Sequence, residues 1–351
     1  MKKRIAFFQN ELTVGGIQKS LINLLSNFDY DKFDVDLYLF NDENYWQSEL
    51  PEQLNIKYLK PVSKIWSLLP FAFSKAFVKP NFGDCGEYDL AIDFNSYQNS
   101  CAVGAIKIPA KRRVMWIHND VEIKLNNEWK YKLLWTMFKG KFKYYDQFIA
   151  VSEGIKEPFR KMSGVSQNIS SIQNYISIKE IEEKLQCEPE NFKVDESKFN
   201  LVALGRLCHQ KGYDIMLDKF SEALKQREDL RLYIIGDGED RAAIEDRIAE
   251  LKLDDKVYLL GNQANPFCYM KHMDAFISTS RYEGQPLNIM EAMAVGLPTY
   301  CTKNLEKYAK GIEGYEDIVS AIVSAEKVEK KPDPLTEYNT TILNSVYALA
   351  E

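Results

Sequence analysis

The sequence predicts an α/β protein of two doubly wound domains, each with a parallel sheet between layers of helices. The length of 351 residues exceeds the size at which one hydrophobic core keeps growing, so two domains of about 150 residues are expected. Short β-rich runs alternate with stretches of helical apolar spacing, which is typical of βαβ units. A content of 45% hydrophobic and 27% charged residues indicates an ordinary folded, soluble chain.

Each half of the chain contains five candidate strands, which are short apolar runs bounded by polar or turn-forming residues. Between them, the clearest helical patterns cover residues 17–28, 213–226 and 239–252. The expected strands are residues 4–8, 34–40, 88–94, 112–118 and 147–152 in the first half, and 201–207, 231–238, 256–261, 274–280 and 297–301 in the second.

The domain boundary is expected near residue 175, because a polar, acidic segment from Lys179 to Lys198 leads into the second series of strands. Residues 1–175 then form the N-terminal domain and residues 176–334 the C-terminal domain. Residues 335–351 read as one more helix after a linker, and it can pack on either domain, including back on the N-terminal one.

The charge and the cysteine pattern of the chain restrict its expected binding partners and cellular compartment. The net charge of -6 divides into +4 for residues 1–175 and -10 for the remainder, and this acidic balance argues against general nucleic-acid binding. The six cysteines form no C-x-x-C pair, which favours reduced thiols in a cytoplasmic protein. We expect no signal peptide, because only four apolar residues follow the basic start before Gln9. We expect no membrane span, since no apolar run reaches the roughly 18 residues needed to cross a bilayer.

Ligands of open α/β sheets bind beyond the carboxyl ends of the strands, so the residues that follow each strand are candidate site residues. Gly15 and Gly16 open a helix after the first strand, where backbone N–H groups can approach an anion; a flexible loop with an ordinary cap is the alternative. Arg206 and Lys211 lie between a strand and a helix, and Gly205 leaves room for backbone approach. Two such cations suit a diphosphate, although solvated surface ion pairs are the alternative.

His118 closes the strand at residues 112–118. A single histidine is more often a structural group than a catalytic one, and its place at a carboxyl end is what favours a functional role.

Two glutamates, Glu283 and Glu291, flank the start of a predicted helix that should end at Gly296 and Pro298. Eight helical residues would separate them by about 12 Å, beyond the roughly 5 to 9.5 Å of paired glycosidase carboxylates. We therefore expect Glu283 to face one part of an extended ligand and Glu291 to accept hydrogen bonds from hydroxyl groups farther along. The loop between them offers backbone N–H groups, except at the proline; it consists of Gly284, Gln285, Pro286, Leu287 and Asn288.

Together these residues resemble the motifs of glycosyltransferase family 4, retaining enzymes of the GT-B fold, in which two Rossmann-like domains face an interdomain cleft. Glu283 and Glu291 match the E-x7-E motif in "EGQPLNIME", and Arg206 and Lys211 match the basic pair of the second domain. The resemblance runs from about residue 4 to residue 302.

The resemblance extends to the first half, where Gly15 and Gly16 match the glycine loop and His118 matches, less specifically, a histidine near the transferred sugar. Two departures stand out. Gln285 and Pro286 replace a common Phe-Gly, so local donor contacts are expected to differ from those of the family. The usual Gly-Gly-Glu segment after "GLP" is missing, so the final helices are expected to differ as well.

The resemblance implies a hexosyltransferase that moves a sugar from a nucleotide-sugar, with UDP-sugars favoured, to a glycan or lipid-linked acceptor in bacterial-type capsule, lipopolysaccharide or glycolipid synthesis. The N-terminal domain would bind the acceptor and the C-terminal domain the donor. Arg206 and Lys211 would neutralise the departing diphosphate, Glu283 would stabilise developing positive charge, and His118 would contact the sugar. No cofactor and no metal is expected, because the nucleotide-sugar is a substrate and "DVD" at residues 34–36 lies within a strand.

Two alternatives stay open. One is a non-catalytic nucleotide-sugar or carbohydrate-binding protein of the same fold; a nicotinamide dehydrogenase is disfavoured because the first strand lacks G-x-G-x-x-G. The other concerns location, since residues 60–80 and 124–143 interleave lysines with aromatic residues. Such segments can bind an anionic membrane surface, here the inner face of the plasma membrane, or they can be ordinary packed helices with lysines in water.

Overall fold

The computed structural model describes residues 2–13, 15–42, 49–63, 70–127, 132, 135–137, 139–190, 192–333 and 335–351, and the chain divides into two compact units. Unit 1 consists of Met1–Ile176 together with Thr336–Glu351, and unit 2 of Ser177–Leu335. The boundary of the units lies one residue after the expected one.

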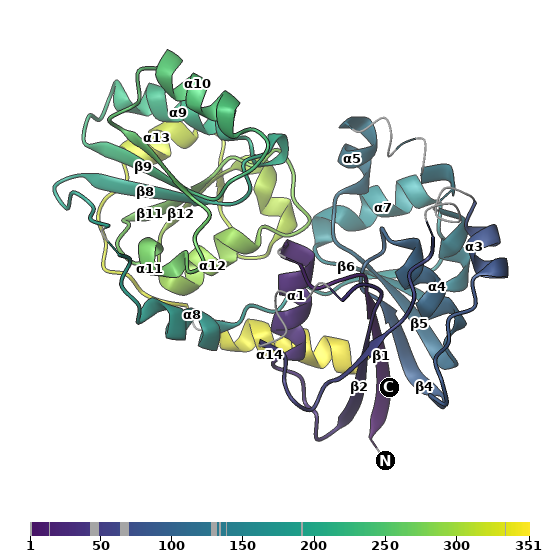
Figure 1. Cartoon of the computed structure of the whole chain (residues 1–351). Coiled ribbons are helices and arrows are strands. Elements are labelled where there is room, and N and C mark those ends of the chain that lie inside the picture. The colour runs from purple at the N-terminus through teal and green to yellow at the C-terminus, as the bar shows by residue number, and fades with distance from the viewer. Residues whose placement is uncertain are drawn as a thin grey trace. The chain divides into compact units, whose positions relative to one another are not determined.

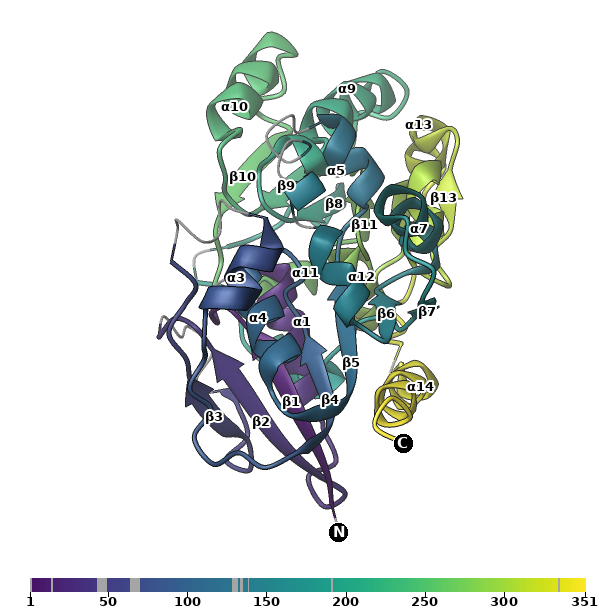
Figure 2. The same cartoon turned by 90° about the vertical axis from the view of Figure 1, so that its right-hand side faces the viewer.

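Unit 1 is built on a seven-stranded sheet in the order β3-β2-β1-β4-β5-β6-β7, and every pairing in it is parallel. Figure 2 shows this order, with β3 at one edge and β7 at the other. The strands are β1 (Lys3–Gln9), β2 (Phe33–Leu39), β3 (Asn55–Tyr58), β4 (Tyr88–Asp93), β5 (Ala110–Ile117), β6 (Gln147–Ala150) and β7 (Asn168–Ser171).

The helices of unit 1 cover this sheet, and α4 packs closely on β1 and β4. Gly104 makes that approach possible, because a Cβ atom there would lie 2.5 Å from the ring of Phe8. The helices are α1 (Gly16–Leu25), α3 (Phe71–Phe77), α4 (Asn99–Lys107), α5 (Val121–Asn127), α7 (Lys156–Ser163) and α14 (Thr336–Tyr347), with 3₁₀ turns η2 (Lys139–Tyr144) and η3 (Glu153–Ile155).

Helix α14 belongs to unit 1 although it follows unit 2 in the chain. Its Tyr347 ring stacks on Phe33 at 4.7 Å and meets Phe28 edge-on at 5.0 Å. The side-chain amide of Asn339 donates to the carbonyl of Ile176 at 2.8 Å and accepts from its N–H at 3.1 Å. Apolar packing and a buried amide pair therefore join α14 to residues distant in sequence.

Unit 2 has a six-stranded parallel sheet in the order β10-β9-β8-β11-β12-β13. Figure 1 shows α9, α10 and α13 on one face and α8, α11 and α12 on the other. The strands are β8 (Phe199–Leu204), β9 (Leu230–Ile235), β10 (Val257–Gly261), β11 (Ala275–Ser278), β12 (Thr299–Thr302) and β13 (Gly314–Tyr315). The helices are α8 (Ile178–Leu185), α9 (Tyr213–Leu224), α10 (Arg241–Glu250), α11 (Phe267–Met270), α12 (Leu287–Val295) and α13 (Ile318–Val323), with η4 (His209–Lys211) and η5 (Lys303–Tyr308).

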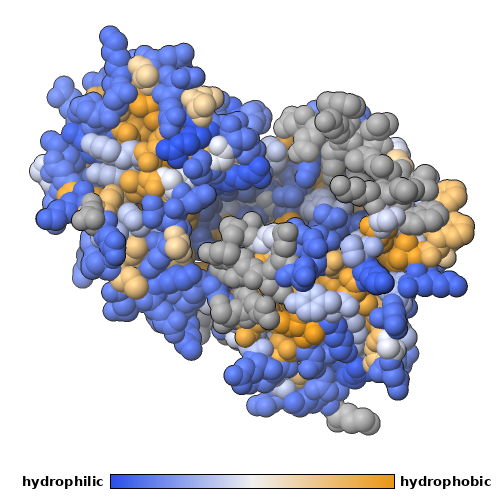
Figure 3. All heavy atoms as spheres, in the orientation of Figure 1, coloured by the Kyte–Doolittle hydropathy of each residue, from blue (hydrophilic) through white to orange (hydrophobic). Residues whose placement is uncertain are grey.

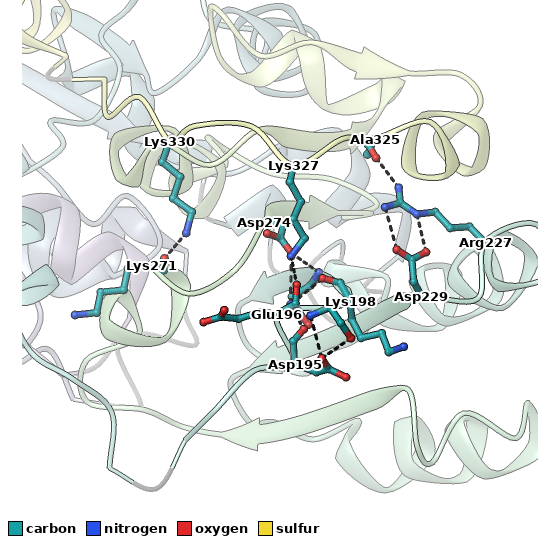
Figure 4. A network of polar contacts seen from close by, with 12 residues as sticks. Asp195, Glu196, Lys198, Arg227, Asp229, Lys271, Asp274, Ala325, Lys327 and Lys330 are labelled. Atoms are coloured by element: carbon teal, nitrogen blue, oxygen red, sulfur yellow. Dashed lines mark hydrogen bonds and ion pairs between the residues drawn. The ribbon is translucent and has the colours of Figure 1, made fainter.

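The segment that leaves unit 2, residues 325–333, is tied to that unit by charged side chains, as Figure 4 shows. Lys327 forms an ion pair with Asp274 at 3.2 Å, and Arg227 donates to the carbonyl of Ala325 at 2.5 Å. The segment is therefore anchored along unit 2 before α14 begins.

The prediction of two doubly wound, parallel-sheet domains is confirmed, and each of the ten expected strands overlaps an observed one. The expected polar connection from Lys179 to Lys198 is in part helical, since α8 lies within it and buries Ile181. The interdomain cleft stays a prediction. Among the helices of the described residues, none has the length and apolar character needed to cross a membrane.

Candidate functional site

The loops after β8 and β9 lie side by side because the hydrogen-bond ladder continues beyond both strands. Gly205 donates to the carbonyl of Ile235 and Leu207 donates to that of Asp237, both at 3.0 Å. A Cβ atom on Gly236 would lie 2.1 Å from the Gly205 carbonyl oxygen, so the approach requires glycine there. The two loops are thus fixed relative to one another at the carboxyl edge of the unit 2 sheet.

Lys211 and Glu283 form an ion pair at this edge, with Nζ and Oε1 2.7 Å apart. Lys211 ends η4, and Glu283 lies in the turn between β11 and α12. The side chains are 20% and 7% exposed, so the pair is largely withdrawn from water. Gln210 donates from Nε2 to the other carboxylate oxygen at 3.2 Å and to the Tyr282 carbonyl at 3.1 Å, and both oxygens of Glu283 are therefore bonded.

Glycines shape the backbone around Lys211. Gly212 has a φ of 66°, and a Cβ atom there would lie 2.3 Å from the carbonyl oxygen of Thr279, whose hydroxyl donates to Gly212 at 2.8 Å. A Cβ atom on Gly205 would lie 3.2 Å from Cε of Lys211. Small residues on both sides of the lysine therefore let it reach the carboxylate.

Arg206 pairs with a different carboxylate, that of Glu239 in the loop after β9. Nη2 and Nε of the guanidinium lie 2.8 and 3.0 Å from Oε2 of Glu239. These side chains are 70% and 54% exposed, in contrast to those of the Lys211–Glu283 pair. The structure thus brings Lys211 and Glu283 together, and it gives Arg206 a partner that was not expected.

The loop and helix that follow Glu283 are fixed by packing. Residues 284–286 are buried, and Asn288, in the first turn of α12, donates to the carbonyl of Leu204 at 2.7 Å. Glu291 is half-buried within α12. The helix ends at Gly296, whose φ is 90°, as the sequence predicts. Asn288 therefore joins α12 to the end of β8, and ligand contacts of the loop stay a prediction.

His118 lies in unit 1, directly after β5, and is only 6% exposed. Its Nε2 donates to the carbonyl of Phe94 at 2.8 Å, and the two rings are 4.7 Å apart. Burial lowers the pKa of His118 to about 3, so the imidazole is neutral at physiological pH. It holds the loop after β4, and its expected contact with a sugar stays a prediction.

Asp93, the last residue of β4, forms a second buried polar group in unit 1. It accepts from the Tyr145 hydroxyl at 2.7 Å, and burial raises its pKa to about 6. Lys141 is 1% exposed and donates to the carbonyl of Ser96. Lys141 therefore fits neither interpretation of residues 124–143, a membrane surface or lysines in water, because it is used inside the fold.

The two glycines at the start of α1 are not required by the fold. Gly15 has an extended φ of 176°, and a Cβ atom there would meet only the flexible end of the Gln18 side chain. A Cβ atom on Gly16 would have nothing within 4 Å. Their expected role beside an anion stays a prediction.

The "DVD" sequence of β2 is structural. Asp36 is 5% exposed and accepts from Lys57 at 2.6 Å and from the Tyr88 hydroxyl. Over the residues that the structure describes, no three His, Cys, Asp or Glu side chains gather where they could hold a metal ion.

Comparison with known proteins gives a family match that lies within unit 2. Residues 187–331 match the family model described as glycosyl transferases group 1, and they include Arg206, Lys211, Glu283 and Glu291. An uncharacterized glycosyltransferase of Methanocaldococcus jannaschii is 27% identical over 194 residues, which is 54% of this chain and 47% of that protein. The lipopolysaccharide 1,6-galactosyltransferase of Salmonella typhimurium is 31% identical over 159 residues, 44% of this chain and 42% of that enzyme. The chain thus spans less than half the length of these relatives.

A solved structure matches the whole chain. The crystal structure of Anabaena HepE in complex with UDP and glucose has a TM-score of 0.68 at 17% identity and covers 99% of this chain and 98% of its own. The fold is therefore that of the GT-B class. The family model and the relatives thus show similarity to glycosyltransferases of group 1, and the solved structure shows the fold alone.

Proposed function

We propose that the protein is a retaining hexosyltransferase of family 4 type, which moves a sugar from a nucleotide-sugar, with UDP-sugars favoured, to a glycan or lipid-linked acceptor. The observation that carries this proposal is the Lys211–Glu283 ion pair of 2.7 Å, at the carboxyl edge of the unit 2 sheet and inside the segment that matches group 1. The Salmonella relative acts, by its name, on lipopolysaccharide, which supports a role in surface polysaccharide or glycolipid synthesis.

The chemistry follows from the charges of this pair. As the glycosidic bond breaks, negative charge collects on the leaving diphosphate and positive charge on the sugar ring. Lys211 would neutralise the first and Glu283 would stabilise the second, with Gln210 holding the carboxylate in place. No metal ion is needed in this scheme, since cationic side chains provide the positive charge. Arg206 contributes a second cation, and His118, whose pKa is lowered by burial, would contact sugar hydroxyl groups as a neutral imidazole.

A thermal-shift screen of nucleotide-sugars tests the donor, because a ligand that binds the native state raises its melting temperature. Transfer from the selected donor is then compared in the wild type, Glu283→Gln and Glu222→Gln, where Glu222 is an exposed glutamate paired with Lys219. We expect Glu283→Gln to lose turnover by about a hundredfold, since a charge needed in the transition state is removed.

Each outcome separates the alternatives. A wild type that binds nucleotide-sugars but transfers from none of them would indicate the binding protein. A product with inverted anomeric configuration, seen by NMR, would contradict the retaining mechanism. Equal turnover in Glu283→Gln and Glu222→Gln would contradict the role of the ion pair.

We further propose a peripheral position on an anionic membrane surface through residues 60–80 and 124–143. Within these segments, residues 64–69, 128–131, 133, 134 and 138 lie outside the described residues. In the described part, α3 presents Phe73 and Phe77 to solvent at 46% and 61% exposure. Figure 3 shows apolar surface on unit 1 where α3 lies in Figure 1. An exposed pair at i and i+4 on one helix suits the interfacial region of a bilayer.

Lysines lie on α3 and on the neighbouring η2 turn. Lys75 and Lys143 lie 4.0 and 5.2 Å from the ring centre of Tyr144. Burial lowers the pKa of Lys107, and so do the neighbouring charges of Lys79 and Lys75. Residues 71–80 and 139–144 contain no acidic residue. Each lysine near an anionic surface contributes about 1 kcal/mol to binding.

Sedimentation with vesicles tests this position. We expect binding to vesicles that contain phosphatidylglycerol but not to pure phosphatidylcholine, and loss of binding in Phe73→Ser/Phe77→Ser. Tyr58→Ser, which changes another exposed aromatic residue of unit 1, is the matched control. Binding that the double substitution leaves unchanged would contradict the proposal.

A further inference from the structure

The pairing of Arg206 with Glu239 is built into the backbone of unit 2. Leu207 donates to the carbonyl of Asp237 and accepts from the N–H of Asp240, both at 3.0 Å, so the residues on either side of Glu239 are bonded to the residue after Arg206. A Cβ atom on Gly238 would lie 2.3 Å from the carbonyl oxygen of Leu207, which shows how closely the loops approach. Glu239 is thus held permanently within reach of Arg206.

Glu239 occupies the side of the guanidinium that is best suited to an anion. Nε and Nη2 of Arg206 form one edge of the planar fork, and both lie within 3.0 Å of the same carboxylate oxygen. Arginine binds phosphate through such an edge with two parallel N–H groups. A phosphate and Glu239 cannot use this edge at the same time.

The exposure of the pair allows exchange. The side chains of Arg206 and Glu239 are 70% and 54% exposed, so the contact is of the weak surface kind. The Lys211–Glu283 pair, in contrast, is largely buried. An incoming diphosphate can therefore displace Glu239 from Arg206 at small cost.

We propose that Glu239 is an internal competitor for the diphosphate group of the donor. It neutralises Arg206 when no donor is bound and gives up the guanidinium when the diphosphate arrives, and it takes Arg206 back when the nucleoside diphosphate leaves. This inference rests on the proposed function, because it assumes that Arg206 meets a diphosphate. Glu239 does not touch the reacting atoms, and its effect is on affinity and on release.

The competition has a signature in salt dependence. In the wild type, binding a diphosphate breaks one ion pair and forms another, so the number of exposed ion pairs changes little. In Glu239→Gln an ion pair forms and none breaks. Because salt screens exposed charges, the affinity of the variant should fall more steeply with ionic strength than that of the wild type.

The experiment is calorimetric titration of UDP, and of pyrophosphate as a probe without a base, into the full chain at low and moderate salt. The proteins are the wild type, Glu239→Gln, Arg206→Ala, the double variant and Glu222→Gln as control, since Glu222 has the same exposure in a pair with Lys219. At low salt we expect Glu239→Gln to bind about two- to fivefold more tightly, the effect typical of one surface ion pair. Its KM for the donor should fall, and UDP should dissociate more slowly than from the wild type.

In the Arg206→Ala background, Glu239→Gln should change affinity by less than about 1.5-fold, because the competitor has nothing left to compete for. If Glu239→Gln tightens binding equally in both backgrounds, Glu239 merely repels the diphosphate and the inference is overturned. Affinity and salt dependence equal to those of the wild type would also overturn it, while leaving the proposed function intact. Failure of the wild type to bind either probe would instead contradict the proposed function.

Discussion

The polar residues at the carboxyl edges of the two sheets differ in charge and in exposure to solvent. In unit 2, Arg206 and Lys211 lie in ion pairs with carboxylates from neighbouring loops, and Arg206 is mostly exposed. In unit 1, His118 and Asp93 are buried. Burial lowers the pKa of His118 and raises that of Asp93, so the neutral form of each is favoured. The exposed Arg206–Glu239 pair of unit 2 is where we propose exchange with an incoming anion, whereas His118 of unit 1 holds the loop after β4.

The two units also differ in how the loops at their carboxyl edges are held in place. His118 and Lys141 donate to the carbonyls of Phe94 and Ser96, so both fix the loop after β4. In unit 2 the loops after β8 and β9 are joined to each other by backbone hydrogen bonds at closely approaching glycines, and the guanidinium of Arg206 stays exposed beside them. The polar residues of unit 1 thus order its loops, and recognition by the charged residues of unit 2 belongs to the proposed function.

The largest expected effect breaks the buried pair of unit 2. Lys211→Met leaves the carboxylate of Glu283 buried without a cation, and we expect it to lower the free energy of unfolding by about 3 kcal/mol. Arg206→Met removes an exposed partner and should not measurably change the unfolding midpoint. Urea unfolding of both variants checks this difference, and equal midpoints would contradict the contrast between the pairs.

A smaller effect concerns pH and unit 1. The pKa of His118 is about 3 in the folded protein and about 6.5 in the unfolded chain, so the unfolded chain takes up the proton first as pH falls. The stabilising effect is complete above pH 6.5 and is lost progressively below it, by about 2 kcal/mol between pH 6.5 and pH 5. His118→Gln retains a donor for the Phe94 carbonyl but lacks this titration.

Unfolding free energies of the wild type and His118→Gln at pH 7 and pH 5 measure that loss. Asp93 acts in the opposite direction, because its raised pKa makes the folded protein bind a proton more readily between about pH 4 and pH 6. Its contribution is common to both proteins and cancels in their difference. An identical pH dependence in the two proteins would show that His118 is solvated.

The smallest effect sharpens the description of the buried pair. Gln210→Ala removes the hydrogen bonds to Glu283 and to the Tyr282 carbonyl, and we expect a loss of about 1 kcal/mol in stability. Gln186→Ala, which removes one bond from an exposed glutamine to the Glu182 carbonyl, should cost less. A lower kcat with an unchanged KM in Gln210→Ala would show that the orientation of Glu283 matters in addition to its charge.

The strands that the sequence did not predict lie at sheet edges. β3 and β7 are the two edges of the unit 1 sheet, and β13 is one edge of the unit 2 sheet. They are four, four and two residues long. An edge strand is partly solvated and need not carry a continuous apolar run, so its pattern is weak. The strands between the edges were all predictable, and most of them are largely buried; β12, with only Cys301 buried, is the exception.

For the candidate site, the individual residues could be predicted from the sequence, but their partners could not. Arg206, Lys211 and Glu283 could be found because charged residues directly follow predicted strands. Their pairing could not, since it depends on which loops meet across the sheet: Glu239 is 33 residues from Arg206, and Glu283 is 72 residues from Lys211. Gln210 had only its position beside Lys211 as a signal.

The return of α14 to unit 1 has a consequence for synthesis of the chain. The contacts of Tyr347 with Phe33 and Phe28, and of Asn339 with Ile176, can form only after the ribosome has translated all of unit 2. At usual elongation rates that interval lasts about 10 to 30 s. Unit 2 can therefore finish folding first. Unit 1 meanwhile lacks α14, and the apolar surface that α14 would cover is open to chaperones.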